Sequence, residues 1–263
     1  MSVKMFAAID VGSYELSLKI VEFIKGEMKV VDTVVYRLDL GTDTYATGKI
    51  PSGKLSELIR VLKEFAAIMR SYKVTNYKAY GTSALRETIN RSILLDQIEL
   101  RSGIHIDLLS NSEQRFLNYK SVASKSKDFL GTIERGTAIA DIGGGSIQIS
   151  LFDNDKLDIT QNIDIGVIRL LGRMKSLDLK SSDYENVLFE LIDSQLSVFK
   201  RPQRIVSNLS VNVIIHLEVK LNCNQILKNT CLPMVSIYIL TVLGYKNEQT
   251  DILLIPPQYE ENL

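Results

Sequence analysis

Over the first 40 residues, hydrophobic and polar positions alternate in the way that is typical of β-strands. Valine and isoleucine are frequent there, and Lys25-Gly26 is a turn signal between two such runs. From Pro51 the hydrophobic residues instead follow the spacing of an amphipathic helix. The pattern of this half predicts, in order, strands at 5–12, 17–24 and 28–41, a helix at 51–74, a strand at 77–84, a helix at 86–103, a strand at 104–110 and a helix at about 112–124.

The second half begins with the same series of elements. Three strands, a helix and two short strands are predicted, at 136–145, 146–155, 156–166, 184–199, 204–207 and 251–256. No segment rich in proline or serine separates the halves, but 124–135 is polar and is the expected crossing point. We therefore expect two α/β domains, residues 1–125 and 126–263, each with a mixed five-stranded sheet flanked by helices.

Short motifs recur at corresponding places in the two halves and indicate an internal duplication. The matched pairs are Asp10-Val11-Gly12 with Asp141-Ile142-Gly143, Leu16-Ser17-Leu18 with Ile149-Ser150-Leu151, and Asp39-Leu40-Gly41 with Asp164-Ile165-Gly166. The pairing of Leu16-Ser17-Leu18 with Ile149-Ser150-Leu151 implies that the turn after Asp141 has two more residues than the turn after Asp10. One match could arise by chance, but three in the same order favour duplication.

Composition excludes several classes of protein. Lys plus Arg and Asp plus Glu both number 31, so no net field favours nucleic acid or an anionic membrane. The apolar run 232–245 is too short to span a bilayer and is expected to be a buried helix. Cys223 and Cys231 form neither a CxxC pair nor a disulfide framework, which favours a reducing compartment, and no signal peptide is expected. The predicted location is the cytoplasm.

The glycine-rich turns are the main candidates for chemistry. After the strand that ends at Asp141, "GGGS" at 143–146 offers backbone N–H groups that can converge on an anion. The carboxylate cannot bind phosphate directly, but it can hold a divalent cation or orient a water molecule. Two such turns would cradle a phosphate from both sides of a cleft. The alternative is a pair of ordinary hairpin turns, which the three glycines and the repeated aspartate disfavour.

Four segments, "AAIDVGS", "YGTSALRETINR", "HIDLLSNSEQ" and "AIADIGGGS", resemble the motifs of the exopolyphosphatase and guanosine pentaphosphate phosphatase (Ppx/GppA) family. The resemblance runs from residue 6 to about 170. It implies two ribonuclease-H-like domains of the actin-like ATPase superfamily with an interdomain cleft. It also implies release of terminal phosphate from polyphosphate or pppGpp, usually with a divalent metal such as Mg²⁺ or Mn²⁺. A homodimer is a further expectation.

The resemblance assigns roles to individual residues of this sequence. Asp141 and Asp10 would hold the metal. The phosphate-binding residues would be Asp10, Gly12, Ser13, Arg86, Gly143, Gly144, Gly145 and Ser146. A guanidinium such as that of Arg86 suits bidentate recognition of phosphate.

The sequence departs from the family pattern at the groups that handle protons. The family motif "SGxEEA" carries the catalytic base as its second glutamate, and here 110–115 reads "SNSEQR", with Gln114 at that position. The glycine turn is normally followed by Ser-x-Glu, and here the third residue is Gln148. An amide cannot take a proton from water and is a poor ligand for a hard cation. Glu113 is the expected substitute base, and Glu15 adds a negative charge beside the first turn.

Three hypotheses follow. The chain is a metal-dependent phosphohydrolase in which Glu113 replaces the missing base, or it is a non-catalytic protein that binds phosphate compounds in the same cleft. The third is a structural partner that needs no ligand. The retained turn at 143–146 favours the first two, and Gln114 and Gln148 favour the second over the first.

Overall fold

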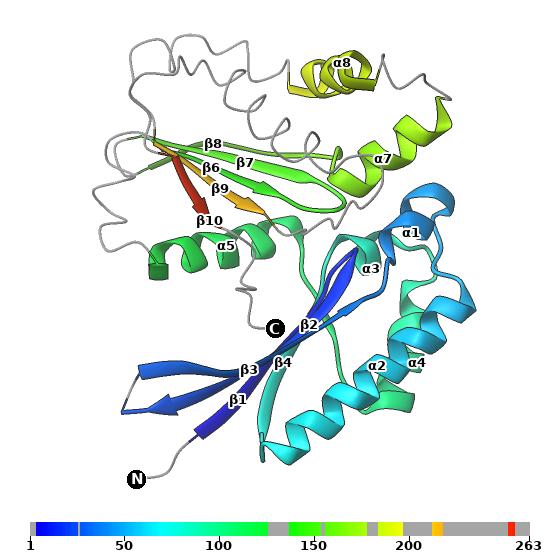
Figure 1. Cartoon of the computed structure of the whole chain (residues 1–263), viewed down its shortest axis with the longest axis vertical. Coiled ribbons are helices and arrows are strands. Elements are labelled where there is room, and N and C mark those ends of the chain that lie inside the picture. Colours follow the sequence, from blue (N-terminus) through cyan, green and yellow to red (C-terminus); the bar gives the residue numbers. More distant parts are fainter. Residues whose placement is uncertain are drawn as a thin grey trace. The chain divides into compact units, whose positions relative to one another are not determined.

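The computed structural model describes residues 4–25, 27–125, 137–153, 156–177, 184–196, 212–217 and 252–255. The chain divides into two compact units, Met1–Gln114 and Arg115–Leu263. Each contains one five-stranded sheet (Figure 1). The division falls earlier than the predicted boundary at 125, and most of the expected crossing segment lies outside the described residues.

The first unit has the sheet order β3-β2-β1-β4-β5. Strands β1 to β3 are antiparallel neighbours, whereas β4 and β5 run parallel to β1. Its elements are β1 (Lys4–Val11), β2 (Glu15–Ile24), β3 (Glu27–Arg37), α1 (Gly41–Thr47), α2 (Ser52–Ser71), β4 (Asn76–Gly81), α3 (Ser83–Glu87), α4 (Arg91–Ser102) and β5 (Asp107–Leu108), and α5 (Asn111–Lys125) begins there.

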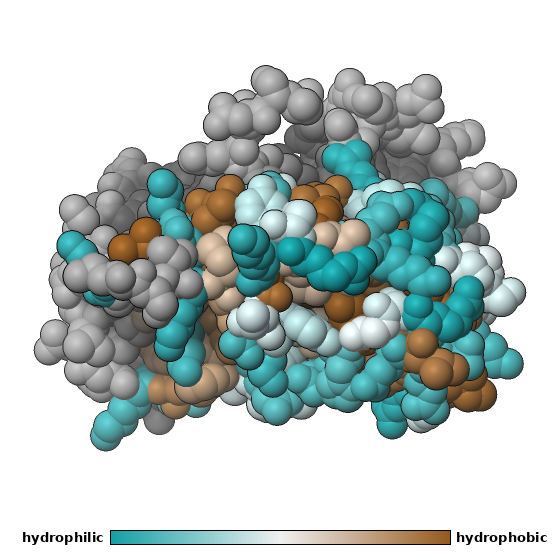
Figure 2. All heavy atoms as spheres, turned by 90° about the horizontal axis from the view of Figure 1, so that it is seen from below, coloured by the Kyte–Doolittle hydropathy of each residue, from teal (hydrophilic) through white to brown (hydrophobic). Residues whose placement is uncertain are grey.

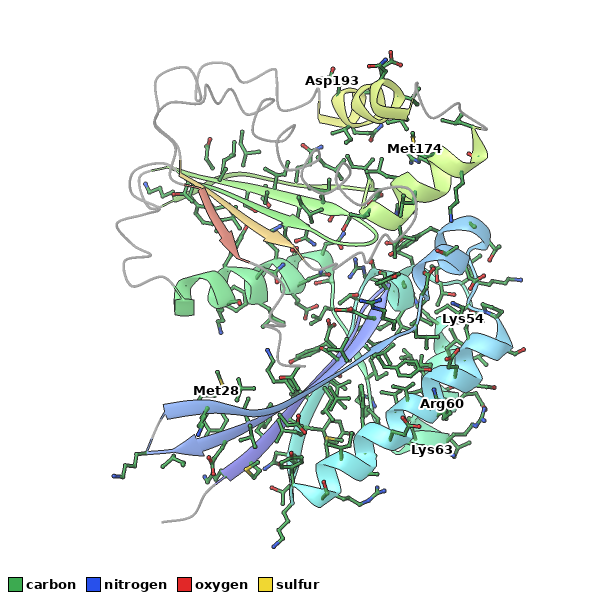
Figure 3. The ribbon with its side chains drawn as sticks, in the orientation of Figure 1. Met28, Lys54, Arg60, Lys63, Met174 and Asp193 are labelled. Carbon is green, nitrogen blue, oxygen red and sulfur yellow. The ribbon has the colours of Figure 1, made fainter. Side chains whose placement is uncertain are left out.

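The core of the first unit follows from the sequence pattern. Alternate residues of β1 and β2 are buried, and one face of α2 packs with them, since its apolar residues recur every three or four positions. On the other face of α2, Arg60 and Lys63 extend away from the sheet and are exposed (Figure 3). The buried hydrophobic core between the sheet and α2 includes Ala7, Ile9, Val11, Leu16, Leu18, Ile20, Leu58, Ile59, Leu62 and Phe65.

Two helices of the first unit differ from the prediction. The single helix expected at 86–103 is two helices, α3 and α4, separated by the segment 88–90. Thr88 is buried there and donates from its hydroxyl to Asn90 Oδ1, and the Asn90 amide donates to the carbonyl of Ile50. These side-chain bonds compete with helix continuation. Helix α1 begins at Gly41, where the sequence pattern predicted only the end of a strand.

The second unit repeats the topology of the first. Its sheet order is β10-β9-β6-β7-β8, with β6 antiparallel to β7 and parallel to β9, as β1 is to β2 and β4. This agreement confirms the predicted mixed sheets and supports the duplication. The elements are β6 (Thr137–Ile142), β7 (Ile147–Asp153), β8 (Lys156–Ile163), α7 (Val167–Ser176), α8 (Tyr184–Leu196), β9 (Asn212–Leu217) and β10 (Ile252–Ile255).

The strand register corrects one detail of the repeat. Asp10 pairs with Ser17 across the first hairpin, and Asp141 pairs with Gln148 across the second. The two loops therefore have equal length, and the expectation of two extra residues in the second turn was wrong. Gln148 corresponds to Ser17, and Ser146 corresponds to Glu15.

Some predicted features lie outside the described residues. They are the strand 204–207, the apolar run 232–245, and both cysteines. The strand that lies parallel to β6 is β9, further along the chain than 204–207. Among the described helices, none combines the length and the hydrophobicity needed to cross a bilayer. The face of the molecule seen in Figure 2 is mostly hydrophilic, with smaller hydrophobic patches between the polar residues.

Candidate functional site

The loop Gly143–Ser146 joins β6 to β7 and is held by the start of α7. Gly143 N–H donates to the carbonyl of Ser146 over 3.0 Å and closes the turn. Three consecutive loop carbonyls are bonded to α7: that of Gly143 to Val167 N at 3.0 Å, that of Gly144 to Ile168 N at 2.9 Å, and that of Gly145 to Arg169 Nε at 2.7 Å.

These three bonds determine where the loop's N–H groups point. In a trans peptide the carbonyl and the following N–H point in opposite directions, and the described residues contain no cis peptide. Since the carbonyls of 143, 144 and 145 point toward α7, the N–H groups of Gly144, Gly145 and Ser146 point away from it. Successive N–H groups on one side of a loop form a site for an anion.

Gly166, the residue before α7, allows this close approach. A Cβ atom at this position would lie 2.3 Å from Gly145 C and from Ser146 N, much closer than real Cβ contacts. The glycine is therefore required because the backbone of the loop occupies the space of a side chain. Gly41, the expected counterpart of Gly166, also lies against a hairpin loop, since its N–H donates to the carbonyl of Ser13.

The first hairpin loop is held in a similar way. Gly12 N–H donates to the carbonyl of Glu15 at 3.0 Å, as Gly143 does to Ser146. The carbonyl of Ser13 accepts from Gly41 N at 2.7 Å, and that of Tyr14 accepts from Leu38 N at 3.1 Å. Both predicted turns are thus closed by the same backbone hydrogen bond, each within its own unit, whereas different groups hold their carbonyls. The prediction that the two turns face one another across a cleft stays a prediction.

Three hydroxyl groups meet beside the first loop. The Ser13 Oγ lies 2.7 Å from the Tyr45 hydroxyl and 2.8 Å from Ser83 Oγ, and Tyr45 and Ser83 are 2.8 Å apart. Sequence reasoning named only Ser13. Ser83 could have been found from its place in "TSALR", but Tyr45 lies in α1, which the sequence pattern did not predict.

Arg86 and Gln114 are brought together in the first unit. Arg86 lies in α3, and its Nη1 donates to the carbonyl of Leu109 at 2.7 Å and to Gln114 Oε1 at 3.5 Å. Gln114 is only 8% exposed. The guanidinium that the resemblance assigns to phosphate therefore contacts the amide that replaces the expected base.

Glu113 has a structural partner of its own. Its carboxylate accepts from the N–H of Ser110 at 2.8 Å, and its own N–H donates to Ser110 Oγ at 3.2 Å. These reciprocal bonds are a capping box at the start of α5. The backbone hydrogen bond from Ser110, with that of its hydroxyl, lowers the pKa of Glu113. The structure thus gives the Glu113 carboxylate a capping role, and its role as substitute base stays a prediction.

The two aspartates lie in different surroundings. Asp10 is exposed on β1, whereas Asp141 is 4% exposed on β6 and accepts a hydrogen bond from the Asn118 amide of α5. Gln148 lies beside Asp141 in the register and is 2% exposed. On β9, the other neighbour of β6, the backbone of His216 pairs with that of Asp141. The sequence did not predict that His216 lies next to Asp141.

The side chains around Asp141 offer few of the oxygen ligands that a divalent cation needs. In the part of the chain that the structure describes, no group of three or more His, Cys, Asp and Glu side chains is arranged to hold a metal. The carboxylate of Asp141 already accepts from Asn118, and its neighbour Gln148 is an amide. Mg²⁺ prefers charged oxygen ligands and water in near-octahedral geometry.

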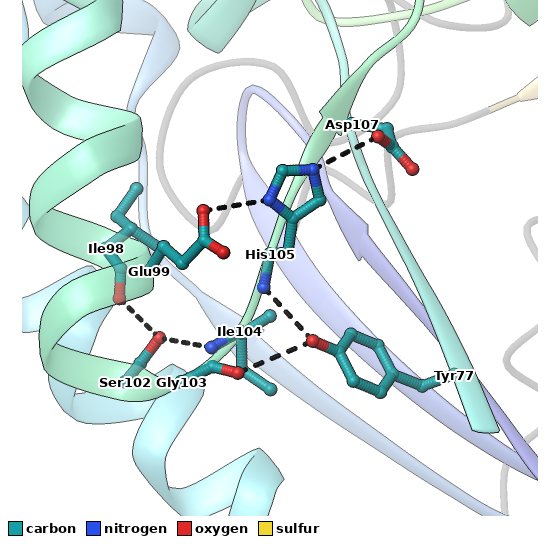
Figure 4. Close-up of polar contacts among 8 residues, drawn as sticks. All are labelled: Tyr77, Ile98, Glu99, Ser102, Gly103, Ile104, His105 and Asp107. Atoms are coloured by element: carbon teal, nitrogen blue, oxygen red, sulfur yellow. Dashed lines mark hydrogen bonds and ion pairs between the residues drawn. The ribbon is translucent and has the colours of Figure 1, made fainter.

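His105 lies at the surface between two carboxylates. Its Nδ1 is 2.9 Å from Glu99 Oε2 and its Nε2 is 3.4 Å from Asp107 Oδ1 (Figure 4). The hydrogen bond to Glu99, with the charges of Glu99 and Asp107, raises the pKa of His105. Asp107 also lies 3.5 Å from Lys78 Nζ. These charges link the end of α4 to β5.

The fold and the loops define a two-unit α/β protein with a short hairpin loop, closed by a backbone hydrogen bond, in each half. Solved structures share this fold: an exopolyphosphatase from Cytophaga hutchinsonii has a TM-score of 0.69 at 20% identity, covering 80% of this chain and 66% of that one. The Aquifex aeolicus member of the Ppx/GppA family has a TM-score of 0.61 at 23% identity, covering 81% and 66%.

The family model described as the Ppx/GppA phosphatase family matches residues 19–217, and the chain belongs to this family. It is 25% identical over 190 residues to exopolyphosphatase 1 of Mycobacterium leprae, covering 72% of this chain and 55% of the relative. It is 24% identical over 185 residues to the guanosine-5'-triphosphate,3'-diphosphate pyrophosphatase of Vibrio atlanticus, covering 70% and 36%. The chain thus spans about half the length, or less, of these relatives.

Proposed function

We propose that this protein binds polyphosphate or pppGpp through its two hairpin loops and hydrolyses them far more slowly than a member of the family with both glutamates. The observation that carries the proposal is the loop Gly143–Ser146, whose carbonyls are bonded to α7 so that three successive N–H groups share the opposite side. Such a loop suits the oxygens of a phosphate group.

The slow hydrolysis follows from the groups near the base position. Gln114 is buried against Arg86 and cannot accept a proton from water. Glu113, its neighbour, is occupied by the cap of α5. Loss of a general base typically costs about 10²–10⁴ in rate. The alternative function, a regulatory protein that binds phosphate compounds without turnover, rests on the same residues and differs only in the residual rate.

The family resemblance implies Mg²⁺ or Mn²⁺, for which Asp141 and Asp10 are the candidate carboxylates. Because the donors around Asp141 fit a divalent cation poorly, we assign no step of the reaction to a metal. A homodimer and a cytoplasmic location are parts of the proposal that sedimentation and cell fractionation test.

Binding is tested by calorimetric titration of the purified chain with tripolyphosphate and with pppGpp, in the presence of Mg²⁺. The wild type is expected to bind, and Gly144→Val is expected to bind much more weakly, because a branched side chain would crowd the loop. The matched control is Gly172→Val, since a Cβ at Gly172 of α7 meets no atom within 4 Å. Absence of binding by the wild type under these conditions would contradict the proposed function.

A further inference from the structure

Polar atoms without partners are concentrated in the second unit on the side of the sheet that α5 covers. Among the described residues, buried side-chain atoms with no hydrogen-bond partner include both polar atoms of Gln148, Oδ1 of Asn162 and Nε of Arg115. A buried polar atom that makes no hydrogen bond costs roughly 1–3 kcal/mol. Several such atoms in one place therefore point to a ligand or to bound water.

The strand register brings three of the side chains together. Gln148 of β7 pairs with Asp141 of β6 on one side and with Asn162 of β8 on the other. Directly paired residues project from the same face of a sheet. Asn118 of α5 donates to the Asp141 carboxylate, so this face is the one that α5 covers. The Tyr119 hydroxyl, which donates to Ser150 of β7, confirms the same contact.

Arg115 adds a positive charge to this face. It precedes Asn118 by three residues on α5 and therefore lies on the same side of the helix, about one turn earlier. Its Nε is buried and has no partner among the described residues. Arginine N–H groups and the NH₂ of an amide are donors, and donors are what an anion requires.

We propose that Arg115 and Gln148, which lie beside Asp141 and Asn162 on this α5-facing side of the sheet, bind a phosphate oxyanion without a divalent cation. Arg115 and the Gln148 amide supply the donors. The inference rests on the proposed function and specifies how its second loop recognises the ligand. Inorganic phosphate and the terminal group of a phosphate chain present the same oxygens, and both are candidates.

The charge balance supports this reading. Where the family motifs carry alanine and glutamate, this chain carries Arg115 and Gln148. The first difference adds one positive charge and the second removes one negative charge. These two positions alone change the charge by the amount that a divalent cation would supply, and Gln114 in place of the family's glutamate removes a further negative charge. One buried carboxylate, Asp141, remains, and its bond from Asn118 offsets part of its repulsion toward phosphate.

The test is calorimetric titration of the full chain with tripolyphosphate and, separately, with inorganic phosphate, in excess EDTA and again in excess Mg²⁺. The wild type is expected to bind in EDTA. Arg115→Ala should weaken binding in EDTA by about tenfold or more, and Arg115→Lys by less, because a charged donor is lost or only altered. The control is Lys120→Ala, which removes a basic residue from the exposed side of the same helix. This variant should bind like the wild type.

Gln148→Glu provides the second arm. It should bind at least about tenfold more weakly in EDTA, because a carboxylate repels the ligand, and should regain binding when Mg²⁺ is added. Wild-type binding that requires Mg²⁺ would overturn the inference while leaving the proposed function intact. Wild-type-like binding in EDTA by both Arg115→Ala and Gln148→Glu would overturn it too, since water would then satisfy the unpartnered atoms. No binding in either buffer would contradict the inference and the proposed function together.

Discussion

Arg169 donates from Nε to the carbonyl oxygen of Gly145 over 2.7 Å, and this bond completes the attachment of the glycine loop to α7. The backbone N–H groups of Val167 and Ile168 hold the two preceding carbonyls. The side chain of Arg169 therefore adds a third hydrogen bond to the two that the backbone of α7 makes with the loop carbonyls. The loop's N–H groups keep their common direction because all three carbonyls are held.

Replacing Arg169 tests this attachment. Arg169→Ala should weaken binding of tripolyphosphate by roughly tenfold, since the Ser146 N–H loses its fixed orientation when a hydrogen bond to a charged donor is removed. Thermal unfolding without ligand should change little. The control is Arg173→Ala, an exposed residue further along α7. Equal affinity of the two variants would show that the Gly145 carbonyl needs no side-chain partner.

Gly166 should tolerate no side chain. In Gly166→Ala the new Cβ would meet the loop backbone at 2.3 Å, and such overpacking typically costs about 1–3 kcal/mol of unfolding free energy. Gly172→Ala in the same helix meets nothing within 4 Å and should gain up to about 1 kcal/mol, because alanine favours the helix over glycine. Urea unfolding of both variants measures the difference. A neutral Gly166→Ala would mean that the loop and α7 are further apart than described.

The capping box at the start of α5 gives a third prediction. Ser110→Ala should lower the unfolding free energy by about 1 kcal/mol, because the N–H of Glu113 loses its acceptor. Glu113→Gln should lower thermal stability slightly and leave any phosphate release unchanged. If Glu113→Gln abolishes a measurable wild-type rate, Glu113 is the working base after all.

His105 predicts a pH dependence of stability. Glu99, with Asp107, raises the folded-state pKa of His105 above its unfolded value of about 6.5. The stabilisation is therefore fully present below about pH 6.5 and is lost as the pH rises through the folded-state pKa. Because the His105 side chain is 62% exposed, solvent screening limits the contribution to no more than about 1 kcal/mol.

The comparison is between wild type and His105→Gln, by urea unfolding from pH 5.5 to pH 8. The wild type should exceed the variant at the acidic end, and the difference should shrink toward pH 8. Glu99→Gln should show a similarly flattened profile. A difference that grows with pH would contradict the assigned direction of the pKa shift.

Much of the fold could be predicted from the sequence, because alternation and helical spacing directly reflect which side chains are buried. The duplicated Asp-x-Gly turns could also be predicted, because glycine at the end of a strand indicates a tight turn that other residues disfavour. The equal length of the loops could not be found, because register depends on backbone bonds such as Gly12 N–H to Glu15 O. The resemblance of Leu16-Ser17-Leu18 to Ile149-Ser150-Leu151 suggested two extra residues that do not exist, since Leu16 corresponds to Ile147 in the register.

The residues that sequence reasoning missed act through tertiary contacts. Tyr45 meets Ser13 because the short segment 38–40 brings α1 back to the first loop, and Arg169 meets Gly145 because Gly166 admits close packing. Glu113 was given the role of substitute base because it stands next to Gln114, and that role stays a prediction. The pattern Ser110-x-x-Glu113 is itself a capping-box signal, so the local interpretation was available from the sequence.

The central claim is that the loops bind phosphate compounds while the proton-accepting groups are missing. Its most direct test is phosphate release from tripolyphosphate and pppGpp by the wild type, by Gln114→Glu and by Gln114→Glu with Gln148→Glu, each with and without Mg²⁺. The account predicts a wild-type rate near background, about 10²-fold or more faster release by the double variant with Mg²⁺, and an intermediate rate for the single variant. Rapid release by the wild type, unchanged by these substitutions, would contradict it.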